Sequence, residues 1–240
     1  MENSYNKIQQ RDPIGQAILD YANNYNYDDI IVNFETLGTS NQPIKQFFRS
    51  KNELCELELH ALKLCRGDVL DVGAGAGPHC TILQNNGINV FAIEASAGAT
   101  KHLKNINIPA ENILFKNFKP NKKFDTILML WNGIGIAGTL EQLKPTLLHA
   151  KSLLNPGGQI LCDSTDSRYI YESNALILNL NEEYYGNFRF RCSYKKTVGD
   201  WVNWLFIDYD RLQSIAHEIG YSCKQISEQD HCFLAQLIIN

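Results

Sequence analysis

The sequence predicts an α/β protein with a doubly wound parallel sheet, and three observations support this fold class. Between residues 67 and 162, short apolar runs alternate with segments of helical periodicity, the pattern of strands joined by crossover helices. The first apolar run, Val69–Val72, leads into a glycine-rich turn. The 240 residues, 44% of them hydrophobic, suffice for one α/β core and would be crowded as two full domains.

Residues 1–66 precede the alternating region and are predicted to form a mainly helical cap. Asp12 followed by Pro13 is a start signal for a helix that runs to about Asn24. Residues 30–37 suit a short strand, and residues 38–43 have the composition of a loop. A second helix is predicted for about 52–64, where leucines recur and can cover the sheet. The core then extends over residues 67–240.

The core contains five predicted strands before its closing unit. They lie near residues 68–72, 89–93, 113–116, 124–130 and 159–163, with helices near 78–86, 97–105 and 140–154 between them. Gly87 and the turn at 155–158 are stop signals. The closing unit is a helix over about 210–219 and two strands over 221–227 and 232–239, whose tight connection requires antiparallel pairing.

Residues 167–206 form an insertion before the closing unit. Residues 188–195 alternate apolar and polar side chains, which predicts a half-buried strand, and residues 201–207 can return as its hairpin partner. The insertion is aromatic and locally basic, which suits a lid over an anionic small molecule. The side chains with this character are Tyr184, Tyr185, Arg189, Arg191, Lys195 and Lys196.

The turn after the first strand indicates a bound cofactor. The three glycines within Gly73–Gly77 let the backbone turn sharply and approach a ligand with no Cβ in the way. The dinucleotide fingerprint G-x-G-x-x-G fails, because Pro78 or Cys80 stands where its third glycine is required. Asp71 lies just before the first glycine, where a carboxylate would repel a pyrophosphate but attract an α-ammonium group. S-adenosylmethionine carries that ammonium group and no phosphate.

Through the motif Val69–Gly77 the sequence resembles the class I S-adenosylmethionine-dependent methyltransferases. It is similar in particular to a group of uncharacterised bacterial members, through Phe48–Ser50, Gly73–His79 and Trp131–Gly135. The resemblance extends from about Phe47 to the C-terminus. It implies methyl transfer from S-adenosylmethionine and a Rossmann-like seven-stranded sheet of order 3-2-1-4-5-7-6, with the last strand antiparallel, N-terminal helices and an inserted hairpin lid.

Ligands of doubly wound sheets lie beyond the carboxyl ends of the strands, so residues there are the candidates for cofactor binding. Asp71 and the glycines are expected to contact the methionine half, and Glu94 the ribose hydroxyls. Asn117 is expected near the adenine N6, where the family often has aspartate, and Trp131 near the sulfonium. Arg49 suits the methionine carboxylate or an acidic substrate, with a surface ion pair as the alternative. The predicted cofactor-binding set is Arg49, Asp71, Gly73, Ala74, Gly75, Gly77, Glu94, Ala95, Asn117, Phe118, Trp131 and Asn132.

Methyl transfer mainly requires alignment of two reactants, and a base only where the attacking atom must lose a proton. Three residues are candidates for catalytic contacts: His79 after the glycine loop, Asp163 after the fifth strand, and His231 in the turn after the sixth. Each has a structural alternative, namely capping and packing for His79, helix capping for Asp163 and an exposed turn for His231. Asn132–Gly135 lacks the Asn/Asp-Pro-Pro-aromatic pattern of enzymes that methylate nucleic-acid bases, which disfavours that acceptor class.

The composition narrows the range of partners. A formal net charge of −4 gives no general attraction to nucleic acid or an anionic membrane. No C-x-x-C pair, secretory leader or apolar run of roughly 18 residues is present, so we expect no metal site and no membrane span. We expect a cytoplasmic monomer or homodimer with a small-molecule methyl acceptor, while a protein or RNA acceptor stays open. The competing hypotheses are a non-catalytic S-adenosylmethionine-binding module and a nicotinamide oxidoreductase.

Overall fold

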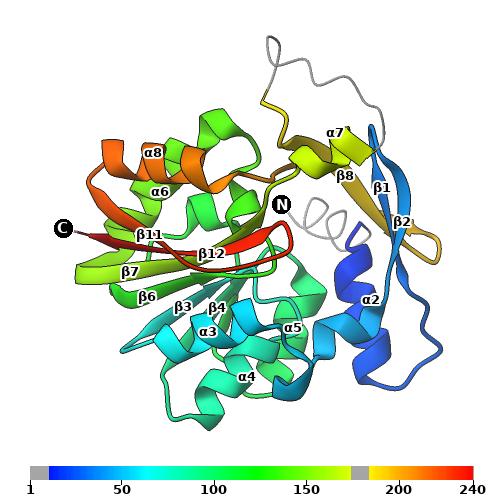
Figure 1. The fold of residues 1–240 in the computed structure, drawn as a ribbon. Helices are drawn as coiled ribbons and strands as arrows, with labels where there is room; N and C mark the ends of the chain where they lie inside the picture. The colour runs from blue at the N-terminus through cyan, green and yellow to red at the C-terminus, as the bar shows by residue number, and fades with distance from the viewer. Residues whose placement is uncertain (1–10, 174–183, 240) are drawn as a thin grey trace.

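A seven-stranded mixed sheet forms the centre of the protein in the computed structural model, which describes residues 11–173 and 184–239 (Figure 1). The strand order is β5-β4-β3-β6-β7-β12-β11, which confirms the predicted order. Neighbours from β5 to β7 pair in parallel, whereas β12 runs antiparallel to both β7 and β11. The strands are β3 (Val69–Val72), β4 (Val90–Glu94), β5 (Ala110–Asn112), β6 (Phe124–Met129), β7 (Leu154–Thr165), β11 (Tyr221–Gln229) and β12 (Cys232–Ile239).

Helices cover both faces of this sheet and create two apolar cores (Figure 1). On one face, α6 (Leu140–Leu153) and α8 (Tyr209–Glu218) pack over the central strands. On the other face lie α3 (Glu56–Leu64), α4 (Pro78–Asn85) and α5 (Ala97–Asn105). Strand β3 is buried on both sides, as expected for a near-continuous apolar run in a parallel sheet. Among the described residues, no helix combines the length and apolarity needed to cross a bilayer.

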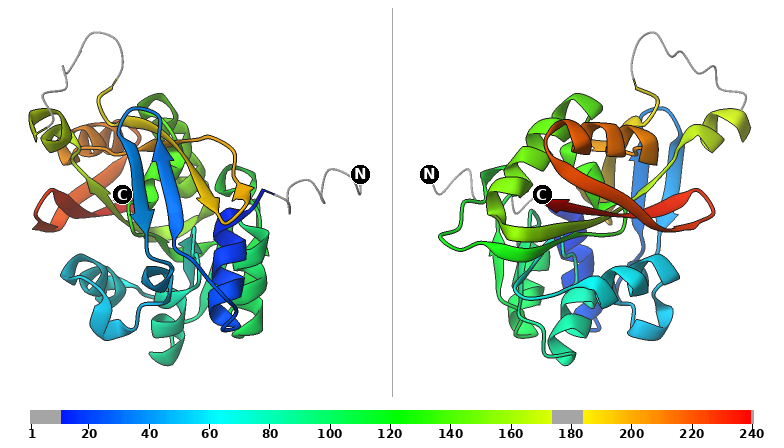
Figure 2. Two further views of the ribbon diagram at one scale, coloured as in Figure 1. Left: turned by 90° about the vertical axis from the view of Figure 1, so that its right-hand side faces the viewer. Right: turned by 60° about the vertical axis from the view of Figure 1, so that its left-hand side comes forward.

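A second, smaller sheet stands beside the carboxyl edge of the first and joins two distant parts of the chain (Figure 2). Its order is β10-β8-β1-β2, from β1 (Ile30–Phe34), β2 (Gly38–Gln42), β8 (Asn187–Tyr194) and β10 (Val202–Leu205), and β9 (Thr197–Val198) pairs with β8. The predicted hairpin of the insertion is therefore confirmed, because β8 and β10 pair antiparallel. The other edge of β8 pairs antiparallel with β1, so the N-terminal segment and the insertion share one sheet.

Helix α2 and several short helical segments complete the described structure. Helix α2 (Pro13–Ala22) begins where Asp12 caps it, and the same carboxylate accepts hydrogen bonds from Ser96 and Gly98 at the start of α5. Two short 3₁₀ turns, η1 (Ile44–Phe48) and η2 (Lys51–Glu53), lead from β2 to α3. The other short elements are η3 (Phe115–Asn117), η4 (Gly133–Ala137) and α7 (Arg168–Ser173). The division into a cap and a core stays a prediction, and residues 174–183 of the predicted insertion lie outside the described residues.

Three element predictions were wrong. Residues 38–43 were expected as a loop, but 38–42 form β2 because their backbone pairs along the whole of β1. The third core strand lies at 110–112, not at 113–116, and the apolar residues that suggested the later position enter η3 and the core beside it. The turn expected at 155–158 lies within β7, where the β6–β7 register shifts. Propensity failed here because short polar strands are stabilised by their neighbours.

Close packing between Gly135 and Trp204 fixes the second sheet against the loop after β6. A Cβ on Gly135 would lie 2.1 Å from Trp204 Nε1, so Gly135→Ala must displace the indole or the loop. We expect a loss of about 1–3 kcal/mol in the free energy of unfolding, measured by chemical denaturation. In a Trp204→Ala background the same change should cost much less, because the clash is gone. Equal costs in both backgrounds would contradict this packing.

Candidate functional site

The glycine loop after β3 has the conformation of a cofactor cradle. Gly73, Gly75 and Gly77 have φ of 76°, 57° and 83°, a region that side chains with a Cβ rarely adopt. A Cβ on Gly73 would meet nothing within 4 Å, so this backbone faces open space. A Cβ on Gly77 would lie 2.6 Å from Leu103, so Gly77 serves packing of the loop on α5. The motif therefore divides into a face available to a ligand and a face that is structural.

Glu94 ends β4 beside this loop. Its carboxylate accepts hydrogen bonds from the backbone N–H groups of Gly75 and Ser96, both at 2.9 Å. Burial raises the pKa of Glu94, and the backbone N–H groups oppose that rise. The following turn is held by Asn112, whose side-chain amide donates to the carbonyls of Glu94 and of the exposed Ala95. The acid thus lies next to the glycines, as the sequence spacing predicts.

Asp71 lies under the glycine loop and is 2% exposed. Its Oδ2 accepts a hydrogen bond from the Cys80 thiol at 3.0 Å, and burial raises the pKa of both groups. Ala74, in the loop above, is also buried. The contact predicted between Asp71 and the methionine half of the cofactor stays a prediction.

Asn117 and Phe118, both in the predicted cofactor-binding set, are placed differently from each other. Asn117 is exposed at the end of η3. The ring of Phe118 is 2% exposed and packs beside Phe91 and Phe124 in the core. The Phe118 side chain is therefore a core residue, and only its backbone remains a candidate for cofactor contact.

The loop after β6 carries Trp131 and Asn132, both with positive φ (64° and 57°). The Trp131 ring is 39% exposed; it meets Phe47 edge-on at 5.0 Å between centroids, and the Arg49 guanidinium lies 5.0 Å from its centroid. Asn132 accepts a hydrogen bond from Thr165 on its side chain. Segments on both sides thus hold two non-glycine residues in a conformation that costs each of them free energy.

A buried carboxylate, Glu58, organises the elements below Trp131. Arg49 donates to both of its oxygens at 2.7 Å, and His79 Nε2 lies 2.8 Å from Oε1. Burial alone would raise the pKa of Glu58, but hydrogen bonds to His79 and Arg49 lower it to about 2. Arg49 and His79 were predicted to contact cofactor or substrate. That role stays a prediction. In the structure both side chains pair with Glu58, which joins α3, α4 and the turn after η1, and Arg49 also lies against the Trp131 ring.

Asp163 lies near the end of β7 and is 9% exposed. Its Oδ1 accepts from the backbone N–H of Gly133 at 3.3 Å, which brings it beside the Trp131–Asn132 loop. Burial raises the pKa of Asp163 to about 7, against the lowering effect of hydrogen bonds from Gly133 and Asn132. A buried carboxyl group with such a pKa next to a ligand-facing loop is a candidate proton acceptor near neutral pH.

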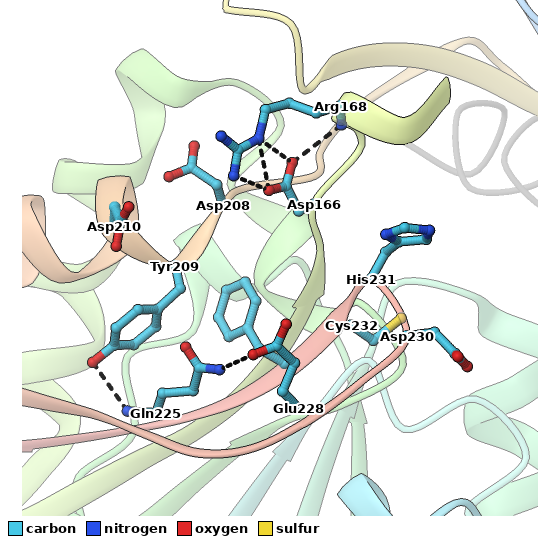
Figure 3. Close-up of a pocket in the computed structure, with 11 residues that line it drawn as sticks. Asp166, Arg168, Asp208, Tyr209, Asp210, Gln225, Glu228, Asp230, His231 and Cys232 are labelled. Carbon is cyan, nitrogen blue, oxygen red and sulfur yellow. Dashed lines mark hydrogen bonds and ion pairs between the residues drawn. The ribbon is translucent and has the colours of Figure 1, made fainter. Parts of the chain in front are cut away.

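His231 belongs to a different hollow, of about 220 Å³, between the β11–β12 turn, the end of β7 and the start of α8 (Figure 3). Its ring stacks on Tyr169 at 4.2 Å between centroids. Two of the carboxylates around this hollow have internal partners: Asp166 pairs with Arg168, and Asp208 accepts from Tyr184 and Tyr185. The hollow is lined by Asp166, Arg168, Asp208, Tyr209, Asp210, Gln225, Glu228, Asp230, His231, Cys232 and Phe233, and includes neither the glycine loop nor Asp163.

A larger hollow, of about 490 Å³, lies behind the glycine loop between the η1–η2 turn, α4 and α5. It is lined by Ala76 but not by Gly73, Glu94 or Trp131. No group of three or more His, Cys, Asp or Glu is placed to hold a metal ion within residues 11–173 and 184–239.

Sequence reasoning missed Glu58 and Trp204. Glu58 was detectable in principle, because it is an acid among the leucines on the buried side of its helix, where an unpaired charge is costly. Trp204 donates its indole N–H to the Asn132 carbonyl at 3.1 Å and so joins the second sheet to the site. That contact spans a sequence separation that no local pattern reveals.

The geometry agrees with comparisons to known proteins. A family model described as a methyltransferase domain matches residues 45–225. A structure of an S-adenosylmethionine-dependent methyltransferase from Bacteroides fragilis in complex with S-adenosyl-L-homocysteine is 35% identical, with a TM-score of 0.88, over 96% of this chain and 95% of that chain. The chain belongs to the class I S-adenosylmethionine-dependent methyltransferases, and its cofactor is S-adenosylmethionine.

More distant structures share the fold. The sugar N-methyltransferase KedS8 from Streptoalloteichus sp. ATCC 53650 is 13% identical with a TM-score of 0.59, over 81% of this chain and 92% of that chain. PH0226 protein from Pyrococcus horikoshii OT3 is 16% identical with a TM-score of 0.60, over 80% of this chain and 94% of that chain. A search of curated proteins found no match.

Removing the Glu58 charge should destabilise the protein in a pH-dependent way. The folded-state pKa, about 2, lies below the ordinary 4.5, so this carboxylate contributes stability above pH 4.5 that is lost as the pH falls toward 2. We expect Glu58→Gln to lower the free energy of unfolding by about 3 kcal/mol at pH 7. The deficit should shrink below pH 4.5, as measured by urea denaturation across pH.

The matched control is Glu56→Gln, which removes an exposed acid from the first turn of the same helix. Its denaturation curves should follow those of the unaltered protein. If the two glutamine variants behaved alike at every pH, the Glu58 ion pairs would not have the stabilising role that their geometry indicates.

Proposed function

We propose that this methyltransferase acts on a small-molecule acceptor, bound between the Trp131–Asn132 loop and the second sheet. The observation that carries this proposal is the Trp204–Asn132 hydrogen bond, because it closes the second sheet over the edge where the cofactor loops meet. An acceptor site covered in this way favours a small ligand over a folded protein surface or a nucleic-acid duplex. The net charge of −4 likewise offers no general attraction to nucleic acid.

We assign the cofactor to the open side of the glycine loop. Gly73 and Gly75 would contact its methionine half, and Glu94 would accept from the ribose hydroxyls. The fit rests on the free space beside Gly73, where a Cβ would meet nothing within 4 Å. Trp131 would place an aromatic face near the sulfonium, for which cation–π attraction is favourable. When bound, S-adenosylmethionine supplies an activated methyl carbon.

The protein's own contribution is alignment and, for a protonated acceptor, proton removal. The second sheet and the Trp131–Asn132 loop would hold the acceptor in place and exclude water. Asp163 would accept the acceptor's proton on a carboxylate oxygen, because it lies beside this loop and its pKa is near neutrality. The direct test is formation of S-adenosylhomocysteine with a panel of small metabolites. Cofactor binding without turnover on any acceptor would favour a non-catalytic binding module.

The assignment of the cofactor cradle predicts a contrast between two glycines with the same backbone conformation. Gly73 and Gly87 both have φ of 76°, and at neither would a Cβ meet an atom within 4 Å. Substitution by alanine should therefore cost each about 1–2 kcal/mol of stability. Only Gly73→Ala should weaken S-adenosylmethionine binding, by about tenfold or more in calorimetric titration. Equal affinities in the two variants would argue against this cradle.

The proposed role of Asp163 predicts a pH profile. Because the pKa of Asp163 is about 7, kcat/KM should rise as the pH increases through neutrality and the carboxyl group loses its proton. Asp163→Asn keeps an acceptor for the Gly133 N–H but removes the base, so kcat/KM should fall roughly 10²–10⁴-fold and that limb should disappear. The exposed control Asp210→Asn should keep both rate and profile. A retained limb in Asp163→Asn would exclude Asp163 as the base.

A further inference from the structure

The second sheet has one face without charged side chains. Strand alternation and register place every second residue of β1, β8 and β10 on this face, which we call the inner face. The arginines of β8, Arg189 and Arg191, lie on the opposite face, where both guanidinium groups stack near Trp201. The inner face consists of Ile30, Val32, Phe34, Phe188, Phe190, Cys192, Tyr194, Val202 and Trp204.

This inner face is turned toward the methyl-transfer edge of the main sheet. At one end, Ile30 and Tyr194 are buried in the same apolar cluster as Ala76 of the glycine loop. At the other end, Trp204 bonds to Asn132 in the loop after β6. The inner face therefore spans the interval between the two loops assigned to the cofactor.

Between these anchors the inner face presents a row of aromatic rings. Phe34 and Phe190 have ring centroids 5.6 Å apart, and Phe190 and Trp204 have centroids 5.9 Å apart. All three side chains are only partly buried, although their neighbours Ile30, Phe188 and Tyr194 are almost inaccessible. The row thus keeps aromatic surface accessible beside the Trp131–Asn132 loop. Covering apolar surface of this kind with a ligand is favourable, because it removes that surface from water.

We propose that the row Phe34–Phe190–Trp204 is the acceptor-binding surface and that the acceptor is an aromatic small molecule with its nucleophilic atom attached to the ring. This inference rests on the proposed function. Contacts between aromatic rings add attraction beyond that of their buried area, so such a row discriminates flat rings from saturated ones. Among the described residues, the inner face itself carries no charged side chain that could pair with a phosphorylated or carboxylated acceptor.

The reaction balances without any further reactant. A lone pair on the acceptor oxygen or nitrogen forms the bond to the methyl carbon. The sulfur–methyl bond breaks, and its electron pair stays on sulfur as S-adenosylhomocysteine. The proton of the acceptor passes to the Asp163 carboxylate.

Binding of matched probes to the full-length protein saturated with S-adenosylhomocysteine tests the proposal. The probes are phenol against cyclohexanol and 2-naphthol against decahydro-2-naphthol, titrated by ligand-observed NMR. We expect the aromatic member of each pair to bind about two- to twelvefold more tightly, as the energy of aromatic contacts predicts. Equal affinities within the pairs, or no binding of either aromatic probe at millimolar concentration, would overturn the inference.

Variants on the two faces of the same strands locate the surface. Phe190→Leu and Phe34→Leu keep apolar bulk without a ring, and each should abolish the preference for aromatic probes while cofactor affinity stays unchanged. Arg189→Ala and Ile31→Ala, on the opposite face of β8 and β1, should retain the preference for aromatic probes. Loss of the preference in the outer-face variants, or its retention in either leucine variant, would overturn the assignment.

An acceptor panel separates this inference from the proposed function. Methylation of cyclohexanol but not of phenol would support the proposed function as a small-molecule methyltransferase. It would contradict the assignment of the aromatic row as the acceptor-binding surface. Tight binding of 2-naphthol, lost in Phe190→Leu but without methylation of any acceptor, would support the surface and contradict the proposed function.

Discussion

The geometry of the elements next to the Trp131–Asn132 loop depends on the pairing of the buried Glu58 carboxylate with Arg49 and His79. A charge removed from water is tolerated only with close partners, and here the partners come from the turn after η1 and from α4. Because both terminal nitrogens of Arg49 donate hydrogen bonds to Glu58, the guanidinium is held against the face of the Trp131 ring. The position of that ring therefore depends, through Arg49, on an acid on α3 whose hydrogen bonds go to Arg49, His79 and the Cys55 backbone.

The second sheet covers the carboxyl edge of the main sheet, which would otherwise be open. Neither contributing segment could do this alone, because β1–β2 and β8–β10 would each be an isolated hairpin of marginal stability. Pairing β1 with β8 combines them, and one face gains a continuous apolar surface. The cost is a set of long-range contacts, among them the Trp204–Asn132 bond, that form only when distant parts of the chain meet.

The extent to which the sequence predicts this structure follows from the range of the interactions involved. The glycine loop and the acids at the ends of β3 and β4 are local features, so their positions were predictable from spacing. The strand order required the family resemblance. Short polar strands such as β2 carry no local signal, because backbone pairing with β1 forms them. The partners of Arg49 and His79 were unpredictable for the same reason: an arginine fork fits any carboxylate, and only the fold brings Glu58 to it.

The left-handed conformations of Trp131 and Asn132 connect these two parts of the molecule. Each costs free energy for a residue with a Cβ, so the loop would relax unless its surroundings held it. Trp131 is held by Phe47 and Arg49, and thus through Glu58 by the elements below it. Asn132 is held by Thr165 of β7 and by Trp204 of the second sheet. A two-residue strained loop therefore ties the assigned cofactor side to the second sheet, and a change that loosens either support acts on both.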